Sequence, residues 1–368
     1  MSTPLVSVVM PSYNHARFIG RAIESVLSQS FSDFEFLIAD DGSRDESANV
    51  IRSYKDKRIV FFENKENRGA CVVHNDLLAA ARGEYVALIN SDDMWVEGKL
   101  HYQVNFMESN KGVGGHFGRA SYIDENDNEI KKSSMPFGGV FDQENRSQAN
   151  WLRFFFDVSN CLCHPTSMIR RACYAEIGGY NNRFRQLPDY DMWIRFVKRY
   201  QLHIGEDPLI RFRVLPGENA SAATEQNQIR VINEHYLIAA HFFDDLADDI
   251  FLQAFADRLA PDVADPLRCI RIEQTLQYFT PNQWLGGVYK AVGLRRLFDH
   301  LNHPEEREIL SDVYGIDDRV FQKMSVEFDA FRPRTVMSAI PDREIVQEFW
   351  YRVKRRLRQR FGAPSLNK

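Results

Sequence analysis

The sequence has few cysteines and no apolar run long enough to cross a membrane. Its five cysteines are odd in number and irregularly spaced among 368 residues, which indicates reduced thiols rather than a disulfide framework. No apolar run approaches the roughly 20 residues that a membrane-spanning helix needs, and no basic and apolar signal segment opens the chain. We therefore expect a cytoplasmic protein that neither crosses a membrane nor carries a recognisable secretion signal.

The sequence also lacks a basic excess and a glycine-rich phosphate loop. Its net charge of −5 argues against nucleic acid as the main partner. Neither a Gly-x-Gly-x-x-Gly turn nor a P-loop lysine motif is present, so a bound nucleotide would need another counter-charge for its phosphates. Cys161 and Cys163, beside His164, lack the second ligand pair of a zinc site, which favours buried structural cysteines.

Short apolar runs alternate with helical periodicity along the first 95 residues. The predicted strands cover residues 5–10, 34–39, 58–62 and 85–89, and apolar residues at helical spacing lie between them. This alternation predicts a mostly parallel sheet with helices on both faces and right-handed crossovers. A further strand is expected from Val113 to Tyr122, followed by a solvated hairpin turn at residues 124–127.

Polar clusters follow three of the predicted strands, at residues 12–14, 40–41 and 90–93. The carboxyl ends of strands in such sheets bind ligands, so these clusters are expected to converge on one edge. Asp92 and Asp93 are adjacent carboxylates that raise each other's pKa. A divalent cation with oxygen ligands, such as Mg²⁺ or Mn²⁺, would relieve their repulsion. The alternative is an acidic turn that caps a helix starting at Trp95 or Val96.

These segments together resemble the successive motifs of a known family. The matching segments are Val-Val-Met-Pro-Ser-Tyr-Asn ending at Asn14, Phe-Leu-Ile-Ala-Asp-Asp-Gly-Ser ending at Ser43, Asn-Arg-Gly ending at Gly69, and Glu-Tyr-Val-Ala-Leu-Ile-Asn-Ser-Asp-Asp ending at Asp93. In order and spacing they resemble family 2 glycosyltransferases of the GT-A fold, which is Rossmann-like. The resemblance runs from Leu5 to about Ser221, about 60% of the chain.

The resemblance implies roles for individual residues on the donor side. Pro11 and Tyr13 would frame the nucleotide base, and Asp41 would hydrogen-bond its edge. Asp92 would contact the ribose or the metal shell, and Asp93 would be the direct ligand of the metal that bridges to the diphosphate. The whole set implied for the nucleotide-sugar donor is Pro11, Tyr13, Asn14, Asp41, His74, Asn75, Asp92 and Arg213, with Mn²⁺ or Mg²⁺ on Asp93 and Asp92.

Two positions depart from the family pattern, and Arg213 has two readings. Asn90 stands where the family often has aspartate, which leaves the metal site resting on Asp93. His74 stands where the family often has arginine, so His74 replaces that contact or the contact is lost. Arg213 contacts a phosphate or is an exposed edge-strand arginine. Residues 215–221 after it form a flexible stretch where the family often closes a loop over the diphosphate.

A second cluster lies on the predicted acceptor side. Asp189 begins a helix in which Met192 and Trp193 follow at helical spacing, so the residues alone favour an N-cap. The resemblance instead implies that Asp189 is the general base. Asp191 either binds the acceptor or stabilises the first turn of the helix, and the second reading is preferred. His164 is assigned to the acceptor side as well.

Helical periodicity without a repeat or a catalytic constellation dominates beyond Thr224. We therefore divide the chain into a GT-A domain at residues 1–223 and an all-helical extension at 224–368. Within the extension, residues 343–361 predict an amphipathic helix with seven basic and two acidic residues, a net charge of +5. Such a helix suits an anionic membrane surface. The alternative is a helix packed on its own domain or on a dimer partner.

The resemblance implies an inverting transfer of a sugar from a nucleotide-sugar donor, most simply a UDP-sugar. The acceptor would be a hydroxyl of a saccharide or lipid-linked saccharide in surface polysaccharide synthesis, at the inner face of the cell membrane. One rival is a sugar nucleotidyltransferase, which should carry a basic glycine-rich loop after the first strand. The other is a non-catalytic sugar- or partner-binding protein with a degenerate site, which Asn90 and His74 favour and the retained aspartates oppose.

Overall fold

The computed structural model describes residues 3–326 except 136, 218–223, 261–266 and 281–284. They lie in one compact unit that spans residues 1–328. The segment 343–361, for which the sequence predicts an amphipathic helix, lies outside the described residues, as does part of the stretch 215–221.

A mixed sheet organises the chain from Val6 to Arg213. Its strands run in the order β3-β2-β1-β4-β8-β6-β9-β5, with β7 paired to β6. The neighbours β3, β2, β1 and β4 are parallel, whereas β8 is antiparallel to both β4 and β6. The strands are β1 (Val6–Ser12), β2 (Phe34–Asp40), β3 (Ile59–Glu63), β4 (Tyr85–Leu88), β5 (Met94–Trp95), β6 (Val113–Ile123), β7 (Glu129–Ile130), β8 (Met168–Arg170) and β9 (Gln201–Arg213).

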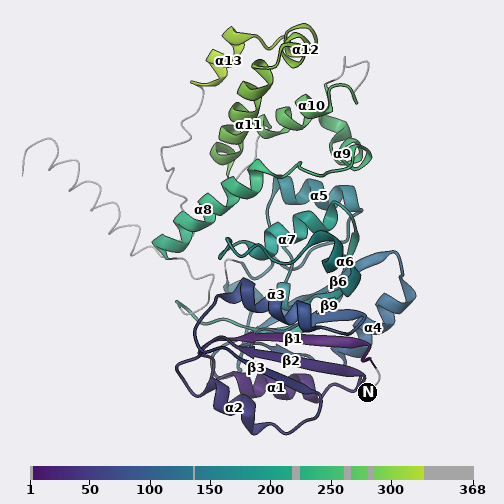
Figure 1. The fold of residues 1–368 in the computed structure, drawn as a ribbon, viewed down its shortest axis with the longest axis vertical. Coiled ribbons are helices and arrows are strands. Elements are labelled where there is room, and N and C mark those ends of the chain that lie inside the picture. Colours follow the sequence, from purple (N-terminus) through teal and green to yellow (C-terminus); the bar gives the residue numbers. More distant parts are fainter. Residues whose placement is uncertain (1–2, 136, 218–223, 261–266, 281–284, 327–368) are drawn as a thin grey trace, which may run out of the picture. The chain divides into compact units, whose positions relative to one another are not determined.

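Alternate residues of the parallel strands point to opposite faces of the sheet, and each face is covered by helices (Figure 1). Val8 packs in one core with Ile23 of α1, whereas its neighbour Val9 packs in another with Val73 of α3. The predicted mostly parallel sheet with helices on both faces is thereby confirmed. The helices of this part are α1 (Ile19–Leu27), α2 (Ser47–Ser53), α3 (Ala70–Ala80), α4 (Lys99–Ser109), α5 (Gln148–Asp157), α6 (Arg171–Ile177) and α7 (Pro188–Val197).

The described residues after Thr224 are helical, in keeping with the predicted extension. Their helices share a core with α5, in which Phe156 lies with its ring centroid 5.0 Å from that of Phe242 and 4.9 Å from that of Tyr289. These helices are α8 (Glu225–Ala240), α9 (Asp248–Phe255), α10 (Ile270–Leu276), α11 (Gly286–Leu301), α12 (Pro304–Tyr314) and α13 (Asp318–Met324). The boundary at residue 223 stays a prediction.

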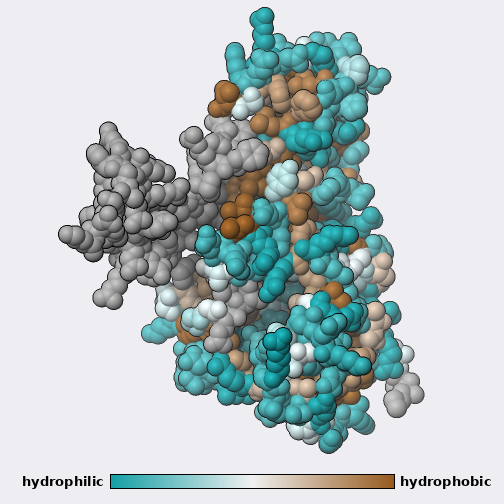
Figure 2. All heavy atoms as spheres, turned by 60° about the vertical axis from the view of Figure 1, so that its left-hand side comes forward, coloured by the Kyte–Doolittle hydropathy of each residue, from teal (hydrophilic) through white to brown (hydrophobic). Residues whose placement is uncertain are grey.

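The face of the molecule shown in Figure 2 is largely hydrophilic but also carries apolar side chains. The exposed apolar side chains of α8 are Ile229, Ile232, Tyr236 and Leu237. Across the described part of the chain, no helix combines the length and the apolar character that a membrane span requires.

Candidate active site

The three strands that end in polar clusters are parallel neighbours, so the predicted convergence on one edge of the sheet is confirmed. Ser12 of β1 pairs with Asp40 of β2, and the Ile89 amide beyond β4 donates to the carbonyl of Val9. Pro11 lies within β1, and Tyr13 follows it with 37% of its surface exposed. An exposed aromatic at the end of a central strand is a surface on which a planar base can stack.

Asn14 and Asp41 hold the loops at this edge together. Asn14 adopts the left-handed conformation with φ 55°, and its side-chain oxygen accepts a hydrogen bond of 2.8 Å from the Arg44 amide. The buried Asp41 carboxylate accepts from the backbone amides of Arg68 at 2.9 Å and Gly69 at 2.8 Å. It also accepts from the Asn64 amide group at 3.0 Å. Asp41 therefore orders the loop that leads into α3.

Asp92 and Asp93 follow β4, and neither caps a helix, which removes the alternative drawn from the sequence. The next helix, α4, starts at Lys99 behind Gly98, and Met94–Trp95 form a short strand instead. The Asp93 carboxylate is 1% exposed and accepts from the Arg213 amide at 2.8 Å and from the Asn90 side chain at 3.0 Å. Burial and the neighbouring Asp92 hold the pKa of Asp93 well above its usual range, and burial raises the pKa of Asp92.

Arg213 contacts both members of this acidic pair and is completely buried. Its interpretation as an exposed edge-strand arginine is therefore wrong. Its strand, β9, is flanked by β6 and β5. The guanidinium donates to the carbonyl of Asp92 at 2.7 Å and forms an ion pair of 2.6 Å with Asp127. Asp127 belongs to the turn between β6 and β7, so this turn supports the Asp92–Asp93 loop. A phosphate contact by Arg213 stays a prediction.

The two carboxylates fit a hard divalent cation, because oxygen ligands suit Mg²⁺ and Mn²⁺ and a cation would offset the charge that burial penalises. The described residues contain no group of three or more histidine, cysteine, aspartate or glutamate side chains that could hold a metal. A cation at Asp92 and Asp93 would therefore take the rest of its oxygen ligands from elsewhere, such as a bound diphosphate or water.

A polar cluster lies at α3 and consists of His74, His164 and Tyr180. The His74 and His164 rings lie 5.5 Å apart, and Nε2 of His164 is 2.7 Å from the Tyr180 hydroxyl. Burial lowers the pKa of His74 to about 4 and that of His164 to about 3, so both rings are neutral near pH 7. Nδ1 of His74 donates to the Ala70 carbonyl, and its buried Nε2 has no hydrogen-bond partner within the described residues.

Asn75 lies one residue further along α3 and binds the backbone of Tyr180 through both ends of its amide. The side-chain oxygen accepts from the Tyr180 amide at 2.7 Å, and the nitrogen donates to the Tyr180 carbonyl at 2.8 Å. This pair of bonds fixes the loop that carries Tyr180 against α3. A contact between Asn75 and a nucleotide stays a prediction.

Replacing Gly179 with alanine is expected to destabilise the protein by about 1–3 kcal/mol through overpacking. A Cβ at this position would lie 2.2 Å from the Asn75 side-chain oxygen and displace it from Tyr180. Urea unfolding of Gly179→Ala measures the cost. Gly112→Ala is the matched control, because no atom lies within 4 Å of its added Cβ. Equal unfolding free energies for the two variants would contradict the tight contact.

Asp189 lies in the first turn of α7 but does not cap it. Leu187 is the N-cap residue and makes no side-chain capping bond. The half-buried Asp189 carboxylate accepts from the Asn160 side chain at 2.7 Å and from the Tyr190 amide at 2.9 Å. Burial, partly offset by these two hydrogen bonds, raises the pKa of Asp189 to about 6. A carboxylate with this pKa is ionised at neutral pH and is a better proton acceptor than an exposed aspartate.

The carboxylate of Asp191 is bound to Arg195 by an ion pair of 2.8 Å on the same helix. Arg195 also donates to the carbonyls of Ile177 and Gly179. This arrangement supports the preferred reading in which Asp191 stabilises the start of α7.

Sequence reasoning missed Asn160, Tyr180 and Glu234, which surround the Asp189 segment. Asn160 and Tyr180 lie in loops that no motif marks. Glu234 lies on the buried face of α8, which the apolar residues Ile232 and Tyr236 do not mark because they are exposed. Burial raises the pKa of the Cys163 thiol well above its usual range, and the charges of Asp93 and Asp189 add to this effect.

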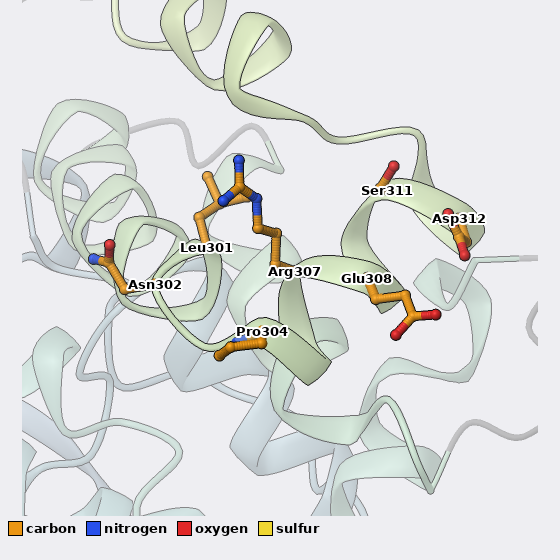
Figure 3. Close-up of a pocket in the computed structure, with 7 residues that line it drawn as sticks. All are labelled: Leu301, Asn302, Pro304, Arg307, Glu308, Ser311 and Asp312. Carbon is orange, nitrogen blue, oxygen red and sulfur yellow. The ribbon is translucent and has the colours of Figure 1, made fainter.

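A surface hollow of 410 Å³ lies elsewhere, at the end of α11 and along α12 (Figure 3). None of the residues that the sequence predicts for the site lines it. Its lining residues are Leu301, Asn302, Pro304, Arg307, Glu308, Ser311 and Asp312.

Comparison with known proteins identifies the family. The sequence profile described as glycosyl transferase family 2 matches residues 7–178. An uncharacterised glycosyltransferase of Methanocaldococcus jannaschii is 30% identical over 66% of this chain and 81% of its own. This chain belongs to glycosyl transferase family 2. It is therefore a glycosyltransferase, as the resemblance of its motifs implies.

One further relative and one solved structure carry fuller descriptions. The Escherichia coli protein WfaP, a UDP-Glc:alpha-D-GlcNAc-diphosphoundecaprenol beta-1,3-glucosyltransferase, is 39% identical over 29% of this chain and 43% of its own. The crystal structure of residues 1–349 of S. aureus TarS in complex with UDP-GlcNAc superposes with a TM-score of 0.56 at 17% identity. It covers 80% of this chain and 84% of the TarS chain. At this identity TarS shows the shared fold alone, which is that of the GT-A enzymes.

Proposed function

We propose that this glycosyltransferase moves a sugar, with inversion, from a UDP-sugar to a hydroxyl of a lipid-linked saccharide in surface polysaccharide synthesis. The observation that carries the proposal is that the candidate carboxylates lie in two separate places, one at the end of β4 and the other on α7. Asp92 and the buried Asp93 are adjacent at the end of β4, whereas Asp189 is half-buried on α7 with its pKa raised to about 6. One group suits the binding of a diphosphate through a cation, and the other suits proton abstraction.

In the proposed reaction the acceptor oxygen forms a bond to the anomeric carbon as the bond from that carbon to the diphosphate breaks. Asp189 accepts the proton of the acceptor hydroxyl. Asp93, with Asp92, would hold the divalent cation, whose bound charge stabilises the departing diphosphate. Tyr13 and Asp41 line the edge of the sheet where the nucleotide would lie. Inversion follows because the acceptor attacks from the face opposite the leaving group.

The choice of UDP and of a lipid-linked acceptor is supported by WfaP, whose name gives UDP-Glc as its donor and a diphosphoundecaprenol-linked sugar as its acceptor. The basic segment 343–361 suits work at an anionic inner membrane face, where such an acceptor would be reached.

The donor is tested with UDP, GDP, dTDP and CDP, each with Mn²⁺, Mg²⁺ or EDTA. A ligand that binds only the native state adds about 2.7 kcal/mol to the free energy of unfolding at 100 times its Kd, and Tm rises as a result. We expect UDP with a divalent cation to raise Tm and EDTA to remove the effect. Turnover is then followed as UDP release from UDP-glucose with a synthetic α-GlcNAc-diphospholipid. The absence of any nucleotide-dependent shift in folded protein would favour a degenerate binding module instead.

A further inference from the structure

The segment that leads into α7 is held by a carboxylate from the helical extension. Glu234 lies on α8 and is 4% exposed. Its Oε1 accepts from the Arg185 amide at 2.8 Å, and its Oε2 accepts from the amides of Gln186 and Leu187, each also at 2.8 Å. Three successive backbone amides, two to four residues before Asp189, therefore point at one buried carboxylate.

We propose that Glu234 is a positioning residue for Asp189, through which the helical extension sets the geometry of the acceptor side. The inference rests on the proposed function, in which Asp189 is the general base. Glu234 touches neither substrate nor the reacting atoms in this scheme. It acts through the three residues 185–187, whose placement fixes where α7 begins.

The segment before α7 is held from outside the helix, and its N-cap residue makes no side-chain capping bond. The first amides of a helix have no partner within it, and an Asp or Ser at the N-cap usually accepts from them. The N-cap here is Leu187, and Pro188 after it has no amide hydrogen to offer. Glu234 satisfies the amides that precede the helix and places negative charge at its positive end. Within the first turn, the Asp189 carboxylate itself accepts from the Tyr190 amide.

The charge of Glu234 also bears on the proton affinity of Asp189. Burial is the main cause of the raised pKa of Asp189, and the negative charge of Glu234 adds to it. The Asp189 charge also acts on three further titratable groups. All three are neutral near pH 7, because burial raises their pKa values. They are Cys71 of α3, with a pKa of about 11, Cys163 before β8, and Tyr180 in the loop after α6.

The test compares wild type, Glu234→Gln, Glu234→Asp and Glu225→Gln as full-length protein. Glu225 is an exposed glutamate in the first turn of the same helix, so Glu225→Gln is a matched control. For each protein we measure kcat and KM for UDP-glucose and the α-GlcNAc-diphospholipid from pH 5 to 8. Hydrogen exchange at residues 185–190 reports the loop independently of turnover, and Tm reports folding.

Glu234→Gln retains one acceptor oxygen but loses the second and the charge. We expect its kcat to fall about 10- to 100-fold, as misplacement of a reacting group does, with faster exchange at residues 185–187. In wild type, kcat/KM should fall at low pH as Asp189 takes up a proton, and we call this fall the acidic limb. In Glu234→Gln the acidic limb should move to lower pH, because removing a negative neighbour lowers the pKa of Asp189. Glu234→Asp keeps the charge, so its acidic limb should lie at the same pH as in wild type. Its kcat should lie between those of Glu234→Gln and wild type. Glu225→Gln should match wild type in all three readouts.

The inference would be overturned if Glu234→Gln folds and matches wild type in kcat, in the acidic limb of kcat/KM and in hydrogen exchange at residues 185–187. The proposed function would then still stand. If Glu234→Gln does not fold, Glu234→Asp carries the test, and rapid exchange at 185–187 together with wild-type kcat would overturn it. Failure of the proposed function is distinct, because Asp189→Asn would then turn over normally with the same acidic limb. In that case no base remains for Glu234 to position.

Discussion

Asp93→Asn is expected to lose metal-dependent binding of UDP and to lower kcat/KM by about 100-fold or more. Asp93 is the more buried member of the acidic pair and is held by the Arg213 amide and the Asn90 side chain. An asparagine oxygen still accepts from Arg213, so the loop is retained while the charge is lost. Thermal shifts with UDP and Mn²⁺, and the UDP release assay, measure the two effects.

The same substitution is expected to stabilise the metal-free protein, because it removes a buried carboxylate that lies next to the like charge of Asp92. Loss of donor binding with a raised Tm would separate a functional charge from a structural one. Asp40→Asn is the matched control, since Asp40 is a buried carboxylate at the end of the neighbouring strand β2 and bonds to Ser43. Stabilisation of Asp93→Asn by UDP that still depends on metal would contradict the assignment.

The parallel half of the sheet was predictable chiefly because, apart from the partly exposed edge strand β3, its strands are buried on both faces. Such strands appear as unbroken apolar runs, and those predicted at 5–10, 34–39, 58–62 and 85–89 correspond to β1, β2, β3 and β4. The edge at which the polar clusters meet follows from the same prediction. Parallel neighbours bring their carboxyl ends together whatever the loops between them do. That is why Asp41 and Asp92–Asp93 could be grouped before any coordinates were known.

The remainder of the sheet depends on contacts that short segments do not encode. Strands β5 and β8 have two and three residues, and each forms only because a longer strand offers it a partner. The sequence alone therefore allows a helix start at Trp95 or Val96, where the structure has the strand Met94–Trp95. The burial of Arg213 has the same origin, since it requires Asp127 from a turn 86 positions earlier, and the predicted turn there was correct in position but not fully solvated.

Helix α8 shows where periodicity alone misleads. Its apolar residues Ile232 and Tyr236 suggest the buried face, yet they are 37% and 43% exposed. The buried face carries Glu234 and His235 instead. A buried carboxylate is tolerated only when hydrogen bonds satisfy it, and the amides that do so belong to residues almost 50 positions away. The support of Asp189 is thus a tertiary property, whereas Asp189 itself could be found from its local motif.

Asp189→Asn is expected to keep UDP binding and to lose about 10²- to 10⁴-fold in kcat, the range that a general base contributes. Its side chain can still accept from the Tyr190 amide, so α7 should keep its start. The wild-type enzyme provides a second signature, because the pKa of Asp189 is raised to about 6. As the pH falls through that value the carboxylate takes up a proton and can no longer accept one, so kcat/KM should fall about tenfold per unit below it.

Asp191→Asn separates the two carboxylates of α7. It breaks the ion pair with Arg195 and is expected to lower Tm while keeping the acidic limb. In Asp189→Asn that limb should disappear from the residual activity, since the group that titrates is gone. Normal turnover by Asp189→Asn, or an acidic limb that survives in it and vanishes in Asp191→Asn, would move the base to Asp191. The raised pKa of Asp189 would then reflect only the burial of a structural carboxylate at the start of a helix.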